Sequence, residues 1–411
     1  MNSLYNLTAH ITYFVLAIYG LFNSKIKLFI NGRKETFDKL SILKKEDQVI
    51  WFHAASLGEF EQARPIIEAI KKNYPSYKVV VSFFSPSGYE VQKNYELADV
   101  VCYLPFDTKG RVQKFIKLVH PEMAIIIKYE FWPNLLNQLN KQAIPTILVS
   151  GIFRKDQAFF KPSAKWMRKS LTAFHHFFVQ NKTSKELLES IEFTNVSISG
   201  DTRFDRVGRI LEQDNSLDFI VNFKNNQYTI VAGSTWSEDE ELLVNYINQS
   251  SDEKFIIAPH TMNPKAIEEL KESIKKKVFL YTEKDGKNIS DFDVLIVNTI
   301  GLLTKIYSYA DVAYVGGAFK TGLHNILEPA TFGIPIVIGP QFTKFNEAID
   351  LVRLKGCVSV KNQQEFSIIF NKLKIDEDFR KETGNINDTY IKKNIGATAQ
   401  IMKYINKQLK S

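Results

Sequence analysis

The sequence predicts an α/β fold of two domains, each built on a parallel sheet that helices cover on both faces. Short apolar runs of strand length recur along the chain at intervals of roughly 20 to 30 residues, the spacing of strand–helix–strand units. Helical periodicity appears between them: Ala63, Ile66, Ile67 and Ile70 stand at i, i+3, i+4 and i+7 after the first run. A length of 411 residues accommodates two domains of about 200 residues each.

The apolar runs form two series, separated by a polar stretch at 212–227 whose only apolar run is LDFI (217–220). The first series is VIWFHAA (49–55), VVVSFF (79–84), VVCYL (100–104), MAIIIK (123–128), TILVSG (146–151), HFFVQ (176–180) and VSIS (196–199). The second is YTIVAGS (228–234), KFIIAPH (254–260), VFLY (278–281), DVLIVN (293–298), DVAYVGG (311–317), PIVIG (335–339) and CVSV (357–360). We expect two doubly wound, Rossmann-like domains at 25–210 and 211–411 that face each other across a cleft. An amphipathic helix at 395–409 is expected to pack back on the first domain.

The N-terminal segment predicts a membrane anchor at 1–24. Residues 4–22 contain no Lys, Arg, Asp or Glu, and 19 helical residues would span roughly 28 Å, about the thickness of a bilayer core. Four polar residues weaken its first half: Asn6, Thr8, His10 and Thr12. A helix lying in the membrane interface and a buried core helix therefore remain alternatives. Positive residues follow the segment, which places the body on the cytoplasmic side: Lys25, Lys27, Arg33 and Lys34.

Composition narrows the function classes. The two cysteines, Cys102 and Cys357, lie far apart in apolar runs, which argues against a disulfide framework and a thiolate metal site. The net charge of +8 and the pI of about 9.0 fit an anionic partner: nucleic acid, a phosphorylated substrate or an acidic membrane face. Nucleic acid fits poorly, because the basic residues do not form a single stripe.

Candidate functional residues follow the runs of the first domain, where doubly wound folds bind ligands. HAASLGE (53–59) places Glu59 as a candidate general base, although its S-x-x-E spacing from Ser56 equally fits a capping box. KYEFWPN (128–134) places Glu130 after the fourth run. GDTRFDR (200–206) supplies Arg203, which suits a phosphate unless it pairs with a neighbouring aspartate.

The stretch ADVAYVGGAFKTGLHNILEPATFGIPIVIGPQ (310–341) indicates a nucleotide site in the second domain. It predicts a strand at 312–315, a turn at Gly316 and Gly317, a short helix opening near Asn325 and a second strand at 336–338. A helix start offers free N–H groups to a phosphate, and Glu328, one turn into that helix, could accept hydrogen bonds from a ribose. An ordinary strand–loop–helix crossover is the plainer alternative.

These motifs, in this order, resemble the 3-deoxy-D-manno-octulosonic acid (Kdo) transferases of lipopolysaccharide synthesis. The resemblance rests on HAASLGE, KYEFWPN, GDTRFD, GSTWSEDE (233–240), the PH of APHTMNP (258–264) and VGGAF…GLHNILEPATFGIPIVIGP. It covers nearly the whole chain, including the N-terminal anchor. It implies a GT-B-type fold, CMP-Kdo as donor, a tetra-acylated lipid A precursor (lipid IVA) as acceptor, and a place on the cytoplasmic side of the cell inner membrane.

The resemblance also implies residue roles. The catalytic base of the family falls on Glu59, and its two transition-state-stabilising positions fall on Glu130 and Arg203. Its CMP contacts fall on nine residues: Pro259, His260, Gly301, Leu302, Leu303, Asn325, Ile326, Leu327 and Glu328. Many members have an arginine where Pro259 stands and a lysine where Arg203 stands, so the chain departs from the family pattern at both positions.

The expected chemistry is an inverting transfer in which Glu59 accepts the proton of the attacking acceptor hydroxyl. We expect no cofactor and no metal, because no Asp-x-Asp pair stands beside a strand end in the second domain. Basic and aromatic residues interleave at 154–169, which suggests an anionic membrane contact or else a solvated amphipathic helix. Two other function classes remain: another nucleotide-sugar enzyme on this fold (a UDP-sugar transferase or an epimerase), and a non-catalytic, membrane-tethered nucleotide binder.

Overall fold

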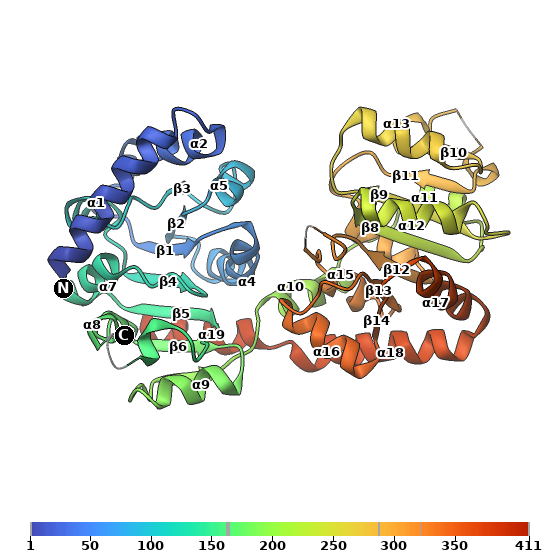
Figure 1. Ribbon diagram of the computed structural model, residues 1–411. Helices are drawn as coiled ribbons and strands as arrows, with labels where there is room; N and C mark the ends of the chain where they lie inside the picture. The colour runs from blue at the N-terminus through green and yellow to red at the C-terminus, as the bar shows by residue number, and fades with distance from the viewer. Residues whose placement is uncertain (1, 162–164, 287, 321, 410–411) are drawn as a thin grey trace. The chain divides into compact units, whose positions relative to one another are not determined.

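The chain forms two compact units (Figure 1). The computed structural model describes residues 2–161, 165–286, 288–320 and 322–409. Unit 1 holds the residues up to Arg206 and those from Gly396 onward, and unit 2 holds Val207–Ile395. The helix α10 (Arg203–Gly208) runs across this division of the chain.

Unit 1 is built on a parallel sheet of seven strands in the order β3-β2-β1-β4-β5-β6-β7. The strands are β1 (Val49–Ala54), β2 (Lys78–Phe83), β3 (Val100–Tyr103), β4 (Met123–Ile127), β5 (Thr146–Gly151), β6 (His176–Val179) and β7 (Val196–Ile198). The helices are α1 (Asn2–Tyr19), α2 (Ser24–Gly32), α3 (Thr36–Leu40), α4 (Leu57–Asn73), α5 (Pro86–Gln92), α6 (Lys109–Val119), α7 (Pro133–Lys141), α8 (Lys165–Leu171), α9 (Lys182–Glu189) and α19 (Ala397–Leu409). The direction of winding reverses between β1 and β4.

Unit 2 repeats this plan with a parallel sheet of seven strands in the order β10-β11-β9-β8-β12-β13-β14. The strands are β8 (Thr229–Thr235), β9 (Lys254–Pro259), β10 (Val278–Leu280), β11 (Val294–Ile296), β12 (Val312–Val315), β13 (Ile336–Ile338) and β14 (Cys357–Ser359). The helices are α11 (Asp218–Lys224), α12 (Ser237–Ile247), α13 (Pro264–Ser273), α14 (Leu303–Ile306), α15 (Leu327–Thr331), α16 (Asn346–Leu354), α17 (Gln363–Ile375) and α18 (Glu377–Asn394). Here the winding reverses between β8 and β12.

Every apolar run of the two series forms a strand, whereas LDFI (217–220) lies at the start of α11, so the prediction of two α/β domains with parallel sheets is confirmed. The runs lack a polar face because both faces of each sheet are buried. In β1, Val49 and Trp51 join the core on one side of the sheet, while Ile50 and Phe52 join the core on the other. Helix α19 completes the second of these cores with Ile401, Met402 and Ile405.

The N-terminal helix α1 is amphipathic and docked on unit 1. Tyr5 donates its hydroxyl to Asp107 at 2.9 Å, and the ring of Tyr13 meets Phe106 edge-on at 4.9 Å. A stripe of six large apolar side chains on α1 remains exposed: Leu4, Leu7, Ile11, Phe14, Val15 and Ile18. Within the described ranges, no helix combines the length and the apolarity that crossing a bilayer requires.

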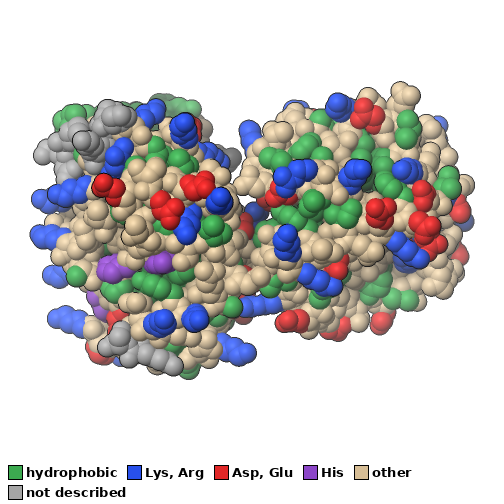
Figure 2. Space-filling view, turned by 90° about the horizontal axis from the view of Figure 1, so that it is seen from below, with side chains coloured by type: hydrophobic (Ala, Val, Ile, Leu, Met, Phe, Trp, Pro, Cys, Tyr) green, Lys and Arg blue, Asp and Glu red, His purple; other side chains and the backbone are tan. Residues whose placement is uncertain are grey.

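The segment 154–169, predicted as a basic and aromatic edge that contacts an anionic membrane, has part of its aromatic side chains in the core. Its residues 162–164 lie outside the described part of the chain. Phe159 is buried in the unit 1 core, and Phe160 packs against that core. Phe131 meets Phe159 edge-on at 5.1 Å, so burial among other aromatic rings takes this side chain away from any membrane face. Figure 2 shows one face of each unit, on which basic side chains lie among acidic ones and form no continuous stripe.

Asp205 fixes the return of the chain to unit 1. Its carboxylate accepts hydrogen bonds from the Gly396 N–H at 2.7 Å, the Thr398 N–H at 2.8 Å and the Thr398 hydroxyl at 2.9 Å. Asp205 is itself buried. It therefore caps α19 from a position almost 200 residues earlier in the chain, where its carboxylate satisfies two backbone N–H groups of the helix start and one side-chain hydroxyl.

We expect Asp205→Ala to loosen α19. Loss of the cap should lower the local opening free energy by about 2 kcal/mol, which is about 30-fold faster amide exchange in 397–409. Hydrogen–deuterium exchange of the full chain, read by mass spectrometry on peptides from α19, measures this rate. Asp388→Ala, which removes an exposed ion pair with Lys392, is the control and should leave the α19 peptides unchanged. Equal exchange in the two variants would contradict the capping role.

Candidate functional site

Each sheet carries a group of polar side chains at the carboxyl ends of the strands, beside the point where its winding reverses. Parallel strands end together at one edge, so loops after β1 and β4 are neighbours in unit 1, as are loops after β8 and β12 in unit 2. The residues singled out in the sequence occupy these loops.

Glu59 lies in the first turn of α4, directly after β1. One of its carboxylate oxygens accepts the Ser56 N–H at 2.9 Å, which belongs to the capping box that the S-x-x-E spacing allows, and it also accepts the Ser56 hydroxyl at 3.1 Å. Burial raises the pKa of Glu59 above its ordinary value, and the Glu130 carboxylate raises it further, against the opposing effects of Lys128 and Ser56. The structural cap and a basic, proton-accepting carboxylate are therefore compatible in one side chain.

Glu130, directly after β4, is held by two donors. Its Oε2 accepts the Trp132 indole N–H at 2.6 Å and contacts His53 Nε2 at 3.0 Å. Burial alone would raise the pKa of Glu130, but the hydrogen bond and charge of His53, with the bond from Trp132, lower it below its ordinary value. Glu59 and Glu130 thus have pKa values displaced in opposite directions, which is the arrangement that separates a proton acceptor from a fixed charge.

His53 is fully buried in β1 and was not singled out in the sequence. Its Nδ1 lies 3.0 Å from the Ser82 carbonyl oxygen and 2.9 Å from the Ser82 hydroxyl. Each ring nitrogen therefore faces an oxygen partner, and a hydrogen on Nε2 is donated to the Glu130 carboxylate, which can only accept. His53 thus orients Glu130 from within the sheet and helps to keep its carboxylate ionised.

Arg203 begins α10 and forms the ion pair that the sequence left as an alternative. Its Nη2 and Nε lie 2.8 and 2.9 Å from Asp201 Oδ2. Asp201 also accepts from Gln62 and Gln180, and although burial would raise the pKa of this carboxyl, Arg203 lowers it. The guanidinium remains partly exposed, at 25%. Asp201 thus aims Arg203 while part of its charge faces outward.

Electrostatic couplings show that these groups share one edge of unit 1. Lys128, which has the left-handed backbone conformation (φ 59°), lowers the pKa values of both Glu59 and Asp201. Arg203 and Glu59 both act on the pKa of Tyr129. The structure therefore gathers the three residues predicted to be catalytic, Glu59, Glu130 and Arg203, and adds Lys128, which the sequence analysis did not weigh.

In unit 2, the turn after β12 is packed too tightly for side chains. A Cβ on Gly316 would lie 2.5 Å from the Ser234 carbonyl oxygen and 2.7 Å from Asp239 Oδ2, and Gly317 adopts a φ of 94°. Asp239 accepts from the Trp236 N–H at 2.9 Å, the Gly317 N–H at 2.8 Å and the Tyr314 hydroxyl at 2.6 Å. This carboxylate ties the loop after β8 to the loop after β12.

An aromatic stack stands beside this turn. Trp236 stacks on His260 with ring centroids 4.7 Å apart, and His260 stacks on His324 at 4.3 Å. The Trp236 indole N–H donates to His324 Nε2 at 2.9 Å, which leaves the hydrogen of a neutral His324 on Nδ1. Burial lowers the pKa of His260, and burial followed by the neighbouring His260 lowers that of His324 to about 4. Both imidazoles are thus uncharged at neutral pH.

The other residues predicted to contact CMP lie in two segments, 301–303 and 325–328, that one hydrogen bond holds side by side. The Thr304 hydroxyl donates to Glu328 Oε2 at 2.7 Å, which places the 301–303 segment beside the 325–328 segment. Asn325 Nδ2 donates to Glu328 Oε1 at 3.0 Å, while the Leu327 N–H donates to Asn325 Oδ1 at 3.1 Å. Pro259 ends β9, and the His260 N–H donates to the Thr235 carbonyl at 2.9 Å. Residues 259–260 and 325–328 are linked by the His324 stack.

A short helix opens near Asn325, as predicted: α15 begins at Leu327, with Ile326 as its N-cap residue, and has only five residues. Asn325 lies before the helix because its side chain caps the turn, and Pro329 fits only the first turn of a helix. A helix of five residues has only a weak dipole, so the side chains of the loop carry the polar character of this segment.

Residues 31–206 match the family described as 3-deoxy-D-manno-octulosonic-acid transferase (kdotransferase). A bifunctional glycosyltransferase/methyltransferase of Fusobacterium nucleatum is 26% identical over 386 residues, covering 88% of this chain and 58% of that protein. The 3-deoxy-D-manno-octulosonic acid transferases of Aquifex aeolicus and Haemophilus influenzae are 27% and 24% identical, covering 85% and 88% of this chain and 95% and 87% of theirs. The chain thus spans less than two-thirds of the Fusobacterium protein.

Solved structures share the fold. The UDP-GlcNAc 2-epimerase from Neisseria meningitidis superposes with a TM-score of 0.62 at 14% identity, over 88% of this chain and 100% of that chain. MurG from Acinetobacter baumannii superposes with a TM-score of 0.55 at 10% identity, over 88% and 99%. At this identity the likeness defines a GT-B-like fold and no activity.

We expect His53→Gln to destabilise unit 1 in a pH-dependent way. Without His53, only the Trp132 indole N–H is left to oppose the effect of burial on the Glu130 carboxylate, so the variant should lose about 3 kcal/mol at pH 8. Because the pKa of Glu130 is lowered in the folded wild type, its stabilising pair is present at neutral pH and is lost as pH falls, so the difference should shrink toward pH 4. Urea unfolding followed by tryptophan fluorescence measures this, since Trp51, Trp132 and Trp166 lie in unit 1.

The double variant His53→Gln/Glu130→Gln is the matched control. It carries no charge at either position, so the pH dependence seen in the single variant should disappear. A pH-independent loss of stability in His53→Gln would mean that His53 only fills space.

Proposed function

This chain is a member of the Kdo transferase family, and on that premise we propose that it moves Kdo from CMP-Kdo to a tetra-acylated lipid A precursor, with inversion at the anomeric carbon. Family membership supports a glycosyltransferase. The donor, the acceptor and the stereochemistry are our proposal, and so are the residue roles that follow.

The observation that carries the proposal is the pair Glu59 and Glu130 at the switch point of unit 1. A raised pKa makes Glu59 a better proton acceptor than an ordinary carboxylate, and the neighbouring Glu130 stays ionised because His53 and Trp132 hold it. Transfer of a sugar to a hydroxyl needs one carboxylate of the first kind. The second kind suits stabilisation of the positive charge that develops on the sugar ring.

In the proposed step, the acceptor hydroxyl oxygen forms a bond to the anomeric carbon of Kdo, and its proton passes to Glu59. The bond from that carbon to the phosphate oxygen breaks, and its electron pair leaves with CMP. Arg203, aimed by Asp201, stabilises the negative charge on the departing phosphate. As Arg203 is a planar guanidinium where many members have lysine, it can hold two phosphate oxygens at once.

Unit 2 supplies the groups for the nucleotide. The stack of Trp236, His260 and His324 offers flat, uncharged ring faces and ring nitrogens to a base, and Pro259 adds an apolar edge where many members have arginine. Glu328 is positioned by Thr304 and Asn325, and its carboxylate suits the diol of a ribose. No step of the proposed transfer takes a proton from unit 2.

The acceptor is a membrane glycolipid, and α1 suits contact with its membrane. The helix is docked by one face and exposes a stripe of large apolar side chains on the other, with Phe14 at 66% and Leu7 at 56% exposure. A helix of this kind lies in the membrane interface with its stripe among the acyl chains. We place the protein on the cytoplasmic side of the inner membrane, attached through α1 and attracted by the net charge of +8.

We expect the purified full chain to add Kdo to lipid A precursor when supplied with CMP-Kdo, with the product weighed by mass spectrometry. Glu59→Gln should reduce the transfer rate by about 100- to 10,000-fold while keeping the fold, because a glutamine oxygen can still accept the cap bonds of Ser56. In the wild type, kcat/KM should fall on acidification at a higher pH than an ordinary glutamate would cause, because the pKa of Glu59 is raised.

The matched control is Glu68→Gln, an acid on the same helix whose change leaves the candidate site intact. Near-native transfer by Glu59→Gln would reduce Glu59 to a helix cap. Binding of UDP rather than CMP, measured by calorimetry, would favour a UDP-sugar transferase or an epimerase. Binding of CMP without any transfer would favour the non-catalytic binder.

We expect the double variant Leu7→Asn/Phe14→Asn to bind vesicles containing anionic phospholipid at least about tenfold more weakly, because two apolar side chains that the membrane would cover are lost from the contact. Both residues are exposed, so the fold should be unaffected. His10→Asn/Thr12→Asn changes the same helix outside the stripe and should bind as the wild type does. Co-sedimentation measures the affinity, and equal binding by both variants would exclude the α1 stripe as the membrane contact.

A further inference from the structure

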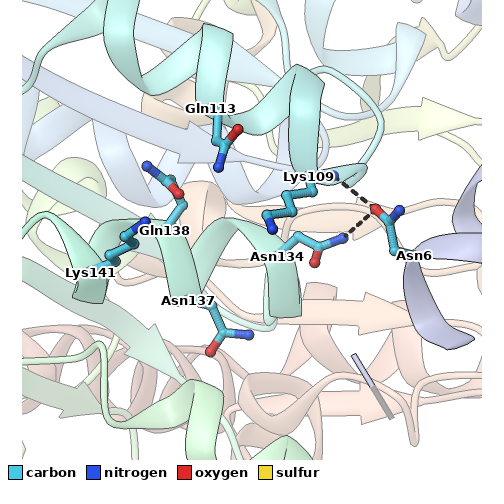
Figure 3. A pocket seen from close by; sticks show the side chains of 7 residues that line it. All are labelled: Asn6, Lys109, Gln113, Asn134, Asn137, Gln138 and Lys141. Atoms are coloured by element: carbon cyan, nitrogen blue, oxygen red, sulfur yellow. Dashed lines mark hydrogen bonds between the residues drawn. The ribbon is translucent and has the colours of Figure 1, made fainter. Parts of the chain in front are cut away.

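A polar hollow lies on unit 1 where α1, α6 and α7 meet (Figure 3). Its volume is about 380 Å³, the size of a small-molecule site, and its lining consists of five carboxamide side chains and two lysines. It uses none of the strand-end residues of the candidate active site. The chemistry of its lining therefore needs an explanation of its own.

Helix α7 contributes most of the lining. Asn134, Asn137, Gln138 and Lys141 stand at i, i+3, i+4 and i+7 and form one stripe, while Leu135 and its apolar neighbours face the core. A solvated helix face usually alternates Lys and Glu, whereas this one is made of amides. Amides on a surface stripe gain little from solvation compared with charges, but they both donate and accept hydrogen bonds.

Helices α6 and α1 close the hollow. Lys109 and Gln113 stand at i and i+4 on α6 and face the α7 stripe. Asn6 of α1 joins the two helices, because its Oδ1 accepts the Lys109 N–H at 2.9 Å and Asn134 Nδ2 at 3.4 Å. The nearby Asp107 carboxylate is buried and accepts from Tyr5, Asn134 and Leu135, so it turns toward the start of α7. Three elements are thus fixed around the hollow by hydrogen bonds.

The hydrogen-bonding groups that remain available in the hollow indicate which ligand it would bind. Among the described residues, no hydrogen bond engages the side-chain amides of Gln113, Asn137 and Gln138, and no carboxylate lines the hollow. Amides match hydroxyl groups, which also donate and accept, and the ammonium groups of Lys109 and Lys141 match a phosphate. A hydroxylated group carried on a phosphate satisfies both kinds of lining at once.

The position of the hollow points to a lipid as the source of this phosphate. Asn6, which lines the hollow, lies within two residues of both Leu4 and Leu7. Both leucines belong to the exposed apolar stripe of α1, and Leu4 is 67% exposed. We propose that the hollow binds the headgroup of a membrane lipid in which a phosphate carries a hydroxylated group, as phosphoglycerol does, while its acyl chains lie along the α1 stripe. This rests on the membrane contact of α1 proposed above and is independent of Kdo transfer.

The test compares two anionic lipids of equal charge. Vesicles of phosphatidylcholine with equal fractions of phosphatidylglycerol or phosphatidylserine are co-sedimented with the full chain, and the wild type should bind the phosphatidylglycerol vesicles several-fold more tightly. Asn137→Asp/Gln138→Glu keeps the shape of the hollow but repels phosphate, and should abolish this preference. Lys109→Glu/Lys141→Glu should do the same and weaken binding by about fivefold per lysine or more.

Lys45→Glu/Lys117→Glu reverses two exposed lysines of unit 1 that do not line the hollow, and should keep the preference even if overall binding falls. Glycerol 1-phosphate should compete with the preference, and inorganic phosphate at the same concentration should not. Equal binding of the wild type to the two lipids, or equal competition by inorganic phosphate, would overturn the proposal. Kdo transfer to detergent-dispersed acceptor, assayed on the same variants, should be unchanged, so failure of transfer and failure of this site are distinguishable.

Discussion

Burial of both faces of each parallel sheet is the constraint on which the rest of this structure depends. Strands such as β1 and β4 are apolar along their whole length because helices cover them on either side, so polar chemistry has no place within the sheets except where it is fully paired. His53 is such an exception and is bonded at both ring nitrogens. Functional groups therefore collect at the carboxyl ends of the strands, and in both units they do so where the winding reverses.

That constraint also explains how the pKa values of two carboxylates at one edge of the same sheet can shift in opposite directions. Glu59 and Glu130 are both removed from water, which raises the pKa of each. Glu130 receives an imidazole and an indole N–H in compensation, whereas the opposing effects of Lys128 and of the Ser56 donors on Glu59 are smaller than the effect of burial and of Glu130. The partner supplied by the buried strand thus decides which carboxylate stays charged, and the other becomes the better proton acceptor.

The sequence predicted the fold well and the site in part. Strand positions followed from apolar runs because two-sided burial leaves a pattern that periodicity reads directly, and β12 and β13 match their predicted bounds. The role of Glu59 stayed open because a glutamate three residues after Ser56 can close the helix start whether or not it also acts as a base. His53 and His324 were missed since a histidine inside an apolar run or a loop shows its value only through partners distant in sequence, Glu130 and Trp236.

The return of the chain to unit 1, where Asp205 caps α19, has a consequence for the order in which the two units fold during synthesis. Unit 1 needs Ile401, Met402 and Ile405 of α19 to close its second core, and these residues leave the ribosome after all of unit 2. Unit 2 is contiguous from Val207 to Ile395, so its sheet can be completed while unit 1 still exposes the α4 surface that α19 covers. During synthesis the first unit is therefore the last to finish, and its apolar surface is the one that a chaperone would have to shield.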